Sequence, residues 1–256
     1  MWATAFIYVF ALLGLGLLRP RAWRGFVQHP MLWWLLLAAG MSNVGFNWAV
    51  TVGDVVRIVL LFYLMPAWSV LLAWPLLGEK PSTGSLFRLA LALSGVVIVL
   101  KTPASPWPVP ESLADYLALM GGFSFALTNI LLRKLKQTPG ESRMLAMFGG
   151  GAVLAGAAAL LGLGLGVVTP LPAPDMTWLG LALLISLAFL AGNLALQYGA
   201  AHLSASATSL IMLSEVVFAS ASSVLLGAGV LTTRTLLGGS LIVLASLLSV
   251  LSFGRR

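Results

Sequence analysis

The chain has 256 residues, of which 60% are hydrophobic and only 8% are charged. Soluble globular chains carry about 25% charged residues, so this composition places the chain among membrane proteins. It contains no cysteine and two histidines, which excludes disulfides, thiol catalysis and a cysteine-ligated zinc site. The net charge of +7 comes from basic residues in short loops between apolar runs, so nucleic-acid binding is not expected. No metal and no cofactor are expected either.

Apolar runs separated by short loops predict an all-α polytopic membrane protein with about nine transmembrane helices. The first run is followed by three arginines and not by a polar domain, so it is interpreted as a spanning helix and not as a cleaved signal peptide. In chain order, the expected spans are 2–18, 31–50, 55–77, 84–100, 113–132, 144–168, 176–198, 204–226 and 232–253.

The basic residues also predict an orientation. Eleven of the fourteen Lys and Arg residues lie in one set of alternate loops, and the other set holds only Arg57, Lys101 and Arg234. Loops rich in Lys and Arg stay in the cytoplasm. The sequence therefore predicts a multi-pass protein of the inner (plasma) membrane with a cytoplasmic C-terminus.

The chain resembles itself at an offset near 150 residues. Three short patterns recur in the same order: Ala11–Leu17 as Ala159–Leu165, Asn43-x-x-x-Asn47-Trp48 as Asn193-x-x-x-Gln197-Tyr198, and Leu76–Gly78 as Leu225–Gly227. A repeat of five spans inverts its second copy, as in alternating-access transporters that bind substrate at the repeat interface. The sequence thus predicts two inverted-topology repeats around a central cavity.

The repeat boundaries lie at the proline-rich loop in the middle of the chain. Residues 1–101 form the expected N-terminal repeat, and residues 112–256 form the C-terminal one. The span 113–132 begins the second repeat, and its counterpart would have to precede Met1. We therefore expect nine helices of a ten-helix fold, with the first helix of the first repeat missing.

Several short motifs resemble those of a known superfamily. They are Gly53–Arg57, Leu61–Pro66, Leu77–Lys80 and the Asp115-Tyr116 pair that opens the fifth span. Together they are similar to the drug/metabolite transporter superfamily and its ten-helix EamA branch, with YddG-type exporters as the nearest comparison. The resemblance implies export of amino acids, including aromatic ones, or of other small metabolites. The second repeat departs from the pattern, because Ala228 stands where Glu79 stands in the first.

Polar side chains inside the spans are the candidate substrate-binding residues. Asn43 with Asn47, and Asn193 with Gln197, form i, i+4 pairs that each share one helix face. They could line a cavity and bind the substrate's amino or carboxyl group, or they could form hydrogen bonds between helices. Glu215 lies near the middle of span 204–226, where a carboxylate by default marks a transport pathway, with helix packing as the alternative.

The third span carries further candidates. Pro66 interrupts it and predicts a helix bend that frees a backbone carbonyl. Tyr63 and Trp68 lie beside this bend and could line the cavity, with core packing as the alternative for Trp68. Asp54 and Arg57, spaced i, i+3 at the outer mouth, are expected to pair with each other, with a gate or a substrate contact as the alternative.

These features favour a secondary active transporter that exports small amphiphilic metabolites, most of all amino acids, by alternating access. Its expected partners are a small-molecule substrate and the lipid bilayer, and proton coupling is left open. A membrane-embedded enzyme is the first alternative, but Glu215 stands alone among mid-span acids and offers no catalytic pair. A non-transporting membrane subunit is the second, although it would need neither an inverted repeat nor polar residues inside its spans.

Overall fold

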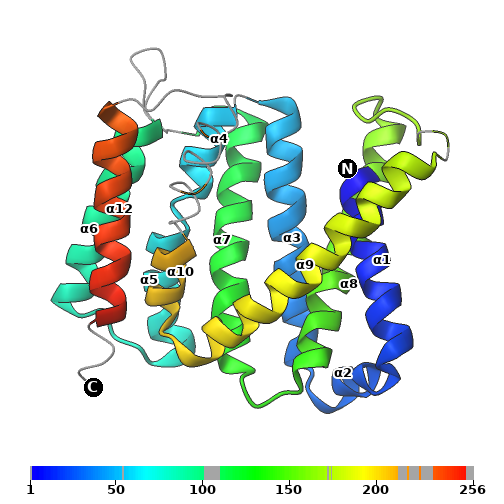
Figure 1. The fold of residues 1–256 in the computed structure, drawn as a ribbon, viewed down its shortest axis with the longest axis horizontal. Coiled ribbons are helices and arrows are strands. Elements are labelled where there is room, and N and C mark those ends of the chain that lie inside the picture. The colour runs from blue at the N-terminus through cyan, green and yellow to red at the C-terminus, as the bar shows by residue number, and fades with distance from the viewer. Residues whose placement is uncertain are drawn as a thin grey trace.

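The computed structural model describes residues 2–53, 55–100, 110–171, 173, 175–212, 218, 225 and 233–251. Within these residues every regular element is a helix, which confirms the predicted all-α class (Figure 1). The first half contains α1 (Trp2–Leu18), the 3-10 helix η1 (Pro20–Arg24), α2 (Gly25–Gln28), α3 (Met31–Val52), α4 (Val55–Phe62), α5 (Met65–Leu77) and α6 (Thr83–Leu100). The second half contains α7 (Leu113–Lys134), α8 (Gly140–Gly164), α9 (Met176–His202), α10 (Ala205–Met212) and α12 (Thr233–Leu251).

Within the described part of the chain, four helices are long and apolar enough to cross a membrane: α3, α7, α8 and α9. The bent pair of α1 and η1–α2 would make a fifth span, and α5, α6 and α12 include shorter apolar helices. The predicted span 55–77 is divided into α4 and α5. The predicted span 144–168 begins four residues earlier, at Gly140. In this added turn Ser142 is buried and donates a hydrogen bond to the Ala22 carbonyl (2.9 Å).

Helix α3 lies at the centre of one half of the molecule, where α7 and α8 pack along it. The core there contains fully buried side chains from all three helices, among them Leu35, Leu132 and Leu145. At the opposite end, α6 packs against α12 through Val96 and Ile242. The cavity described below lies between these two regions.

Two helix crossings depend on glycine. Gly40 of α3 and Gly150 of α8 face each other, and a Cβ on Gly150 would overlap the Leu36 carbonyl. Gly45 of α3 and Gly121 of α7 meet in the same way. Small residues let membrane helices approach closely, so these glycines set the distances of α3 from both neighbours.

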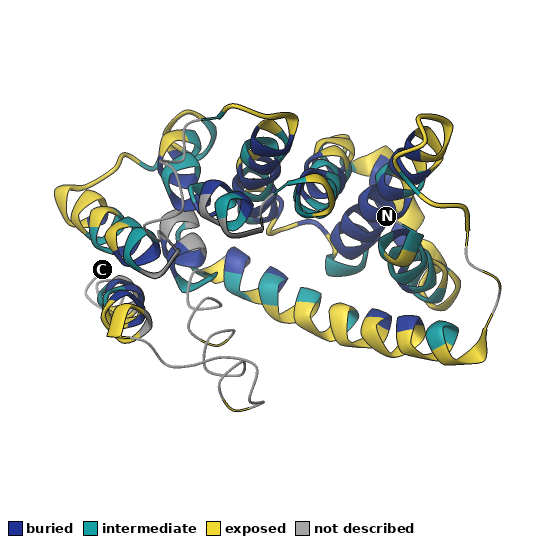
Figure 2. Cartoon of the chain, turned by 90° about the horizontal axis from the view of Figure 1, so that it is seen from above, coloured by how far each residue is buried: buried dark blue, intermediate teal, exposed yellow. Residues whose placement is uncertain are grey.

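Helix α9 differs from the other long helices in its burial. It runs diagonally across the molecule from α8 to α10 (Figure 1) and lies along one side, with most of its length exposed (Figure 2). Only 11% of its most apolar 18-residue stretch is buried, compared with 61% for α7. Its exposed side chains are almost entirely apolar, which suits contact with lipid.

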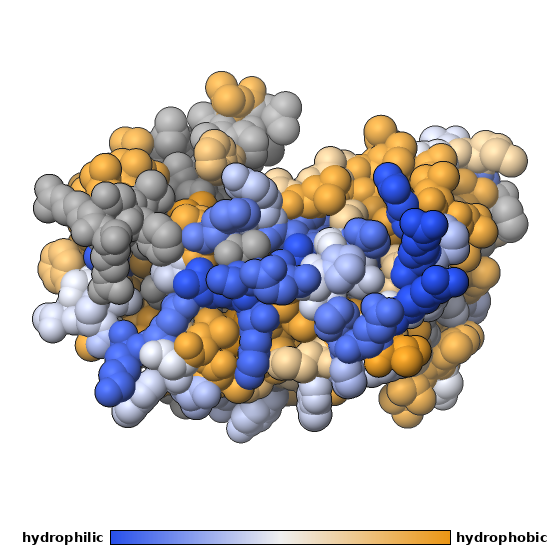
Figure 3. Space-filling model, turned by 90° about the horizontal axis from the view of Figure 1, so that it is seen from below, coloured by the Kyte–Doolittle hydropathy of each residue, from blue (hydrophilic) through white to orange (hydrophobic). Residues whose placement is uncertain are grey.

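The lower ends of the helices in Figure 1 carry the basic segments. They include η1 with Arg21 and Arg24, and the last turn of α7 with Arg133 and Lys134. Figure 3, which shows this face, has a broad band of hydrophilic side chains across it.

We expect this lower face to be cytoplasmic, because basic loops are retained there. Single cysteines can be placed in the cysteine-free chain at Gln137, after α7, and at Thr169, after α8. An impermeant thiol reagent added outside intact cells should label position 169 and spare position 137. The reverse pattern would overturn the orientation.

Candidate functional site: a central cavity

A cavity of about 420 Å³ lies where the two halves of the chain meet. Helices α1, α3, α4, α5, α7, α8, α9 and α10, and the turn between α4 and α5, all contribute to its wall. The lining residues are Tyr8, Ala39, Ser42, Asn43, Phe46, Asn47, Phe62, Tyr63, Met65, Phe125, Thr128, Met147, Phe148, Phe189, Gly192, Asn193, Leu196 and Met212. Four predicted site residues, Asn43, Asn47, Tyr63 and Asn193, therefore line the same cavity.

On the α3 side, the two asparagines use part of their hydrogen-bonding capacity on their own helix. Asn43 Nδ2 donates to the Ala39 carbonyl (2.8 Å), and Asn47 Nδ2 donates to the Asn43 carbonyl (2.9 Å). The Tyr8 hydroxyl donates to Asn43 Oδ1 across the α1–α3 contact (2.6 Å). A primary amide has two N–H donors and two acceptor positions, so these contacts leave capacity for a solute.

On the α9 side, the second carboxamide pair is divided between two positions. Asn193 lines the cavity and its Nδ2 lies 3.4 Å from Met147 Sδ. Gln197 is only 3% exposed and is outside the lining set, although it was predicted to line the cavity. Its side-chain amide lies 2.7 Å from Asn193 Oδ1, so it contacts the lining asparagine from one turn away.

Aromatic rings make up much of the remaining wall. Tyr8 contacts Phe148 and Phe189 with ring centroids 5.7 and 6.0 Å apart. Across the cavity, Phe62 contacts Phe46 at 4.8 Å and Phe125 at 5.8 Å. The sequence did not indicate these residues, because phenylalanine occurs in lipid-facing, core and cavity positions of membrane helices alike.

The break between α4 and α5 places two lining residues. Predicted at Pro66, it lies at Tyr63–Leu64, and Pro66 occupies the first turn of α5. Proline is tolerated there because a first-turn N–H has no partner within the helix. The turn brings Tyr63 and Met65 to the cavity. Trp68, one turn further, is outside the lining set and packs on Phe123 in a T-shaped contact at 5.7 Å.

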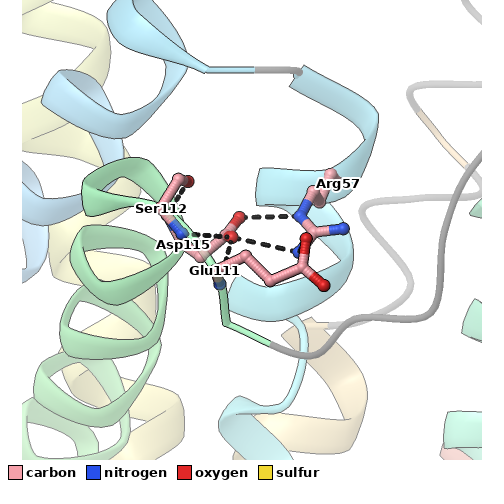
Figure 4. Close-up of polar contacts among 4 residues, drawn as sticks. All are labelled: Arg57, Glu111, Ser112 and Asp115. Atoms are coloured by element: carbon pink, nitrogen blue, oxygen red, sulfur yellow. Dashed lines mark hydrogen bonds and ion pairs between the residues drawn. The ribbon is translucent and has the colours of Figure 1, made fainter.

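An ion-pair network lies at the upper end of the contact between α4 and α7 (Figure 4). Arg57 donates from Nε to Asp115 Oδ1 (2.8 Å) and from Nη2 to Oδ2 (3.1 Å), and Glu111 lies 3.6 Å from Nη2. Asp115 also accepts the backbone N–H groups of Glu111 and Ser112, and Ser112 Oγ accepts the Asp115 N–H. This reciprocal arrangement is a capping box at the start of α7.

Among the described residues, Arg57 pairs with carboxylates 54 and 58 positions away. Asp54, its expected partner at i, i+3 spacing, lies outside the described residues, and so does Glu215. The pairing of Arg57 with Asp54 therefore stays a prediction. The contact with Asp115 arises from the packing of α4 on α7.

A second network lies at the lower end of α7. Arg133 Nε is 2.6 Å from Glu79 Oε1, which follows α5, and Arg133 Nη1 donates to the Leu203 carbonyl at the α9–α10 junction. The Leu77-Gly78-Glu79 motif places this carboxylate, because Gly78 ends α5 in the left-handed conformation (φ 72°) and turns the chain back toward α7.

Comparison with protein families identifies this arrangement. The model of the EamA-like transporter family matches residues 1–101 and 112–251. The chain belongs to the EamA-like transporter family. This confirms the membership in the drug/metabolite transporter superfamily that the sequence motifs suggested, and family members are transporters of the drug/metabolite type.

The fold of this EamA-like chain is shared with a solved structure described as "Crystal structure of protein". The two are 17% identical and superpose with a TM-score of 0.79, covering 99% of this chain and 88% of the other. At this identity the likeness shows the fold alone. A search among curated proteins found no match.

Proposed function

We propose that this EamA-like chain is a secondary active exporter of small amphiphilic metabolites, most of all amino acids with aromatic side chains, in the inner membrane. The observation that carries the proposal is the central cavity, which combines carboxamides from both halves of the chain with a wall of aromatic rings. Its volume of about 420 Å³ falls within the range of small-molecule sites. Aromatic rings suit a flat apolar side chain, and amides suit a polar head group.

The charge of the cavity bears on the kind of head group. Within the described lining residues no side chain carries a formal charge, so an amino acid's charges would be met by amide and hydroxyl dipoles. Glu215, which lies outside the described residues, could bind a substrate amino group or a proton. Competition of the two for one carboxylate is a simple basis for proton antiport.

We also propose that the cavity lies between two inverted repeats, residues 1–101 and 112–256, which would alternate its access. In this scheme α3 and α9 are equivalent. α7 packs along α3, whereas among the described residues no helix covers the corresponding face of α9.

Transport by purified protein in proteoliposomes tests the function. Across a panel of amino acids, wild-type protein should move aromatic ones fastest, and Asn43→Ala and Asn193→Ala should each slow transport about tenfold, the effect of losing one net hydrogen bond. Ser240→Ala is the matched control, because Ser240 is exposed on α12 and bonds only its own helix in the described contacts.

The same assay with and without a pH gradient tests the coupling. Glu215→Gln should remove the pH dependence while leaving folded protein. Absence of transport for every solute in the panel, or normal transport by both asparagine variants, would reject the proposed site. Product formation from a solute in detergent would instead favour the membrane-enzyme alternative.

A further inference from the structure

One face of α7 leads from the cavity to the lower end of the molecule. Phe125 lines the cavity, Asn129 follows one turn later, and Arg133 follows after another turn. Residues at four-residue spacing share a helix face, so the three form one stripe. The stripe ends at the contacts of Arg133 with Glu79 and with the Leu203 carbonyl.

Asn129 is the unusual member of this stripe. It is 1% exposed, and within the described structure neither its Oδ1 nor its Nδ2 has a hydrogen-bond partner. The indole N–H of Trp68 on α5 is buried without a partner in the same way. Trp68 packs on Phe123, on the face of α7 that meets α5 through Ala73 and Ile130, whereas Asn129 lies on the neighbouring face with Phe125 and Arg133.

Buried polar groups without partners are rare, because they lose their hydrogen bonds to water and gain nothing in return. An isolated packing role explains neither group, since an apolar side chain of similar size would fill the space at lower cost. Asn129 would be satisfied if water and solute reached the α7 stripe in another conformation. Its amide supplies N–H donors for a carboxylate or carbonyl oxygen and an acceptor for an amino group.

The Arg133 contacts explain how this region is closed here. Arg133 joins the turn after α5 to the α9–α10 junction, on the lower side of Asn129. The side chains of Arg133 and Glu79 are about one quarter exposed (25% and 29%), and ion pairs at such positions are weak. A weak connection between three segments is suited to opening and closing in each transport cycle.

We propose that Asn129 forms an inner subsite for the polar head group of the solute, between the cavity and the cytoplasmic face. The subsite opens when Arg133 releases Glu79 and the Leu203 carbonyl. This rests on the proposed transport function. During export, the solute occupies this subsite first and then passes up the α7 face to the cavity at Phe125.

Thiol accessibility tests the opening without any transport assay. In the cysteine-free chain, Asn129→Cys should react with a small impermeant reagent from the cytoplasmic side, and adding Glu79→Gln should raise that rate about tenfold. The matched control is Ile130→Cys, a buried neighbour that packs on Ala73 and should stay unreactive in both backgrounds. Phe125→Cys, at the cavity end of the same stripe, provides a second reporter if Asn129→Cys does not fold. Reactivity of both reporters no greater than that of position 130 overturns the proposal.

Asn129→Leu separates binding from packing. Removing an unsatisfied buried amide should leave the melting temperature equal or higher. Transport of the solutes that wild-type protein carries should nevertheless fall at least tenfold. A leucine variant that transports normally overturns the inner subsite. If wild-type protein carries no solute while position 129 still opens to the cytoplasm, the proposed function fails and the opening stands.

Discussion

Gly150→Ala should greatly reduce the amount of folded protein, although it adds a single methyl group. The new Cβ would overlap the Leu36 carbonyl of α3, and Gly40 lies against the same point, so neither backbone can give way cheaply. Overfilling a packed site usually costs 1–3 kcal/mol, and a collision with backbone belongs at or above the upper end, about 3 kcal/mol. Size-exclusion chromatography of heated detergent samples would measure the loss.

Gly156→Ala is the matched control on the same helix. A Cβ there has no neighbour within 4 Å, so the substitution adds no collision. Alanine is favoured over glycine inside a helix by roughly 0.5–1 kcal/mol, so stability should stay equal or rise slightly. Equal stability of the two variants would show that α3 and α8 do not depend on the glycine crossing.

The extent of the helices could be read from sequence because the bilayer imposes a length on apolar runs. The predicted ends of α1, and the starts of α3, α7 and α9, agree with the structure. The division of the third span was expected at Pro66 and lies two to three residues earlier. Hydropathy cannot locate such a break, because a proline in the first turn and a proline in a kink give the same local pattern.

The candidate site was recognisable only through its rarest residues. Asn43, Asn47 and Asn193 attracted attention because amides inside a span are costly and uncommon, and all three line the cavity. Asn129 was not among the predicted site residues, although the same reasoning applies to it. Gln197 shows the limit of the reasoning, since it was predicted to line the cavity but is buried beside Asn193, one turn away on α9.

The sequence did not predict contacts between segments that are far apart along the chain. The ion pairs at the two ends of α7 join it to α4 above and to the turn after α5 below. Both arise from the parallel packing of α7 beside α4 and α5, and this depends on which helices become neighbours. The side chains of the upper pair are less exposed than those of the lower pair, so we expect the upper pair to stay formed throughout transport and the lower pair to open.

Asp115→Asn should therefore destabilise the protein far more than any change at the lower pair. The side chains of Arg57 and Asp115 are 11% and 2% exposed, and the substitution removes the charge of the carboxylate that makes two hydrogen bonds with this guanidinium. Removing one partner of a buried pair costs about 3–5 kcal/mol, and nearby Glu111, which is 70% exposed, suggests the lower end of that range. Thermal unfolding in detergent would measure the effect.

Two comparisons test the reason for that loss. Ser112→Ala removes the other half of the capping box and should cost only about 1 kcal/mol. The double variant Arg57→Met with Asp115→Asn should recover much of the stability lost in Asp115→Asn, because it removes the guanidinium together with the carboxylate charge and keeps an acceptor for the Glu111 and Ser112 N–H groups. If the double variant is less stable than either single one, the attraction between the two side chains itself stabilises α4 on α7.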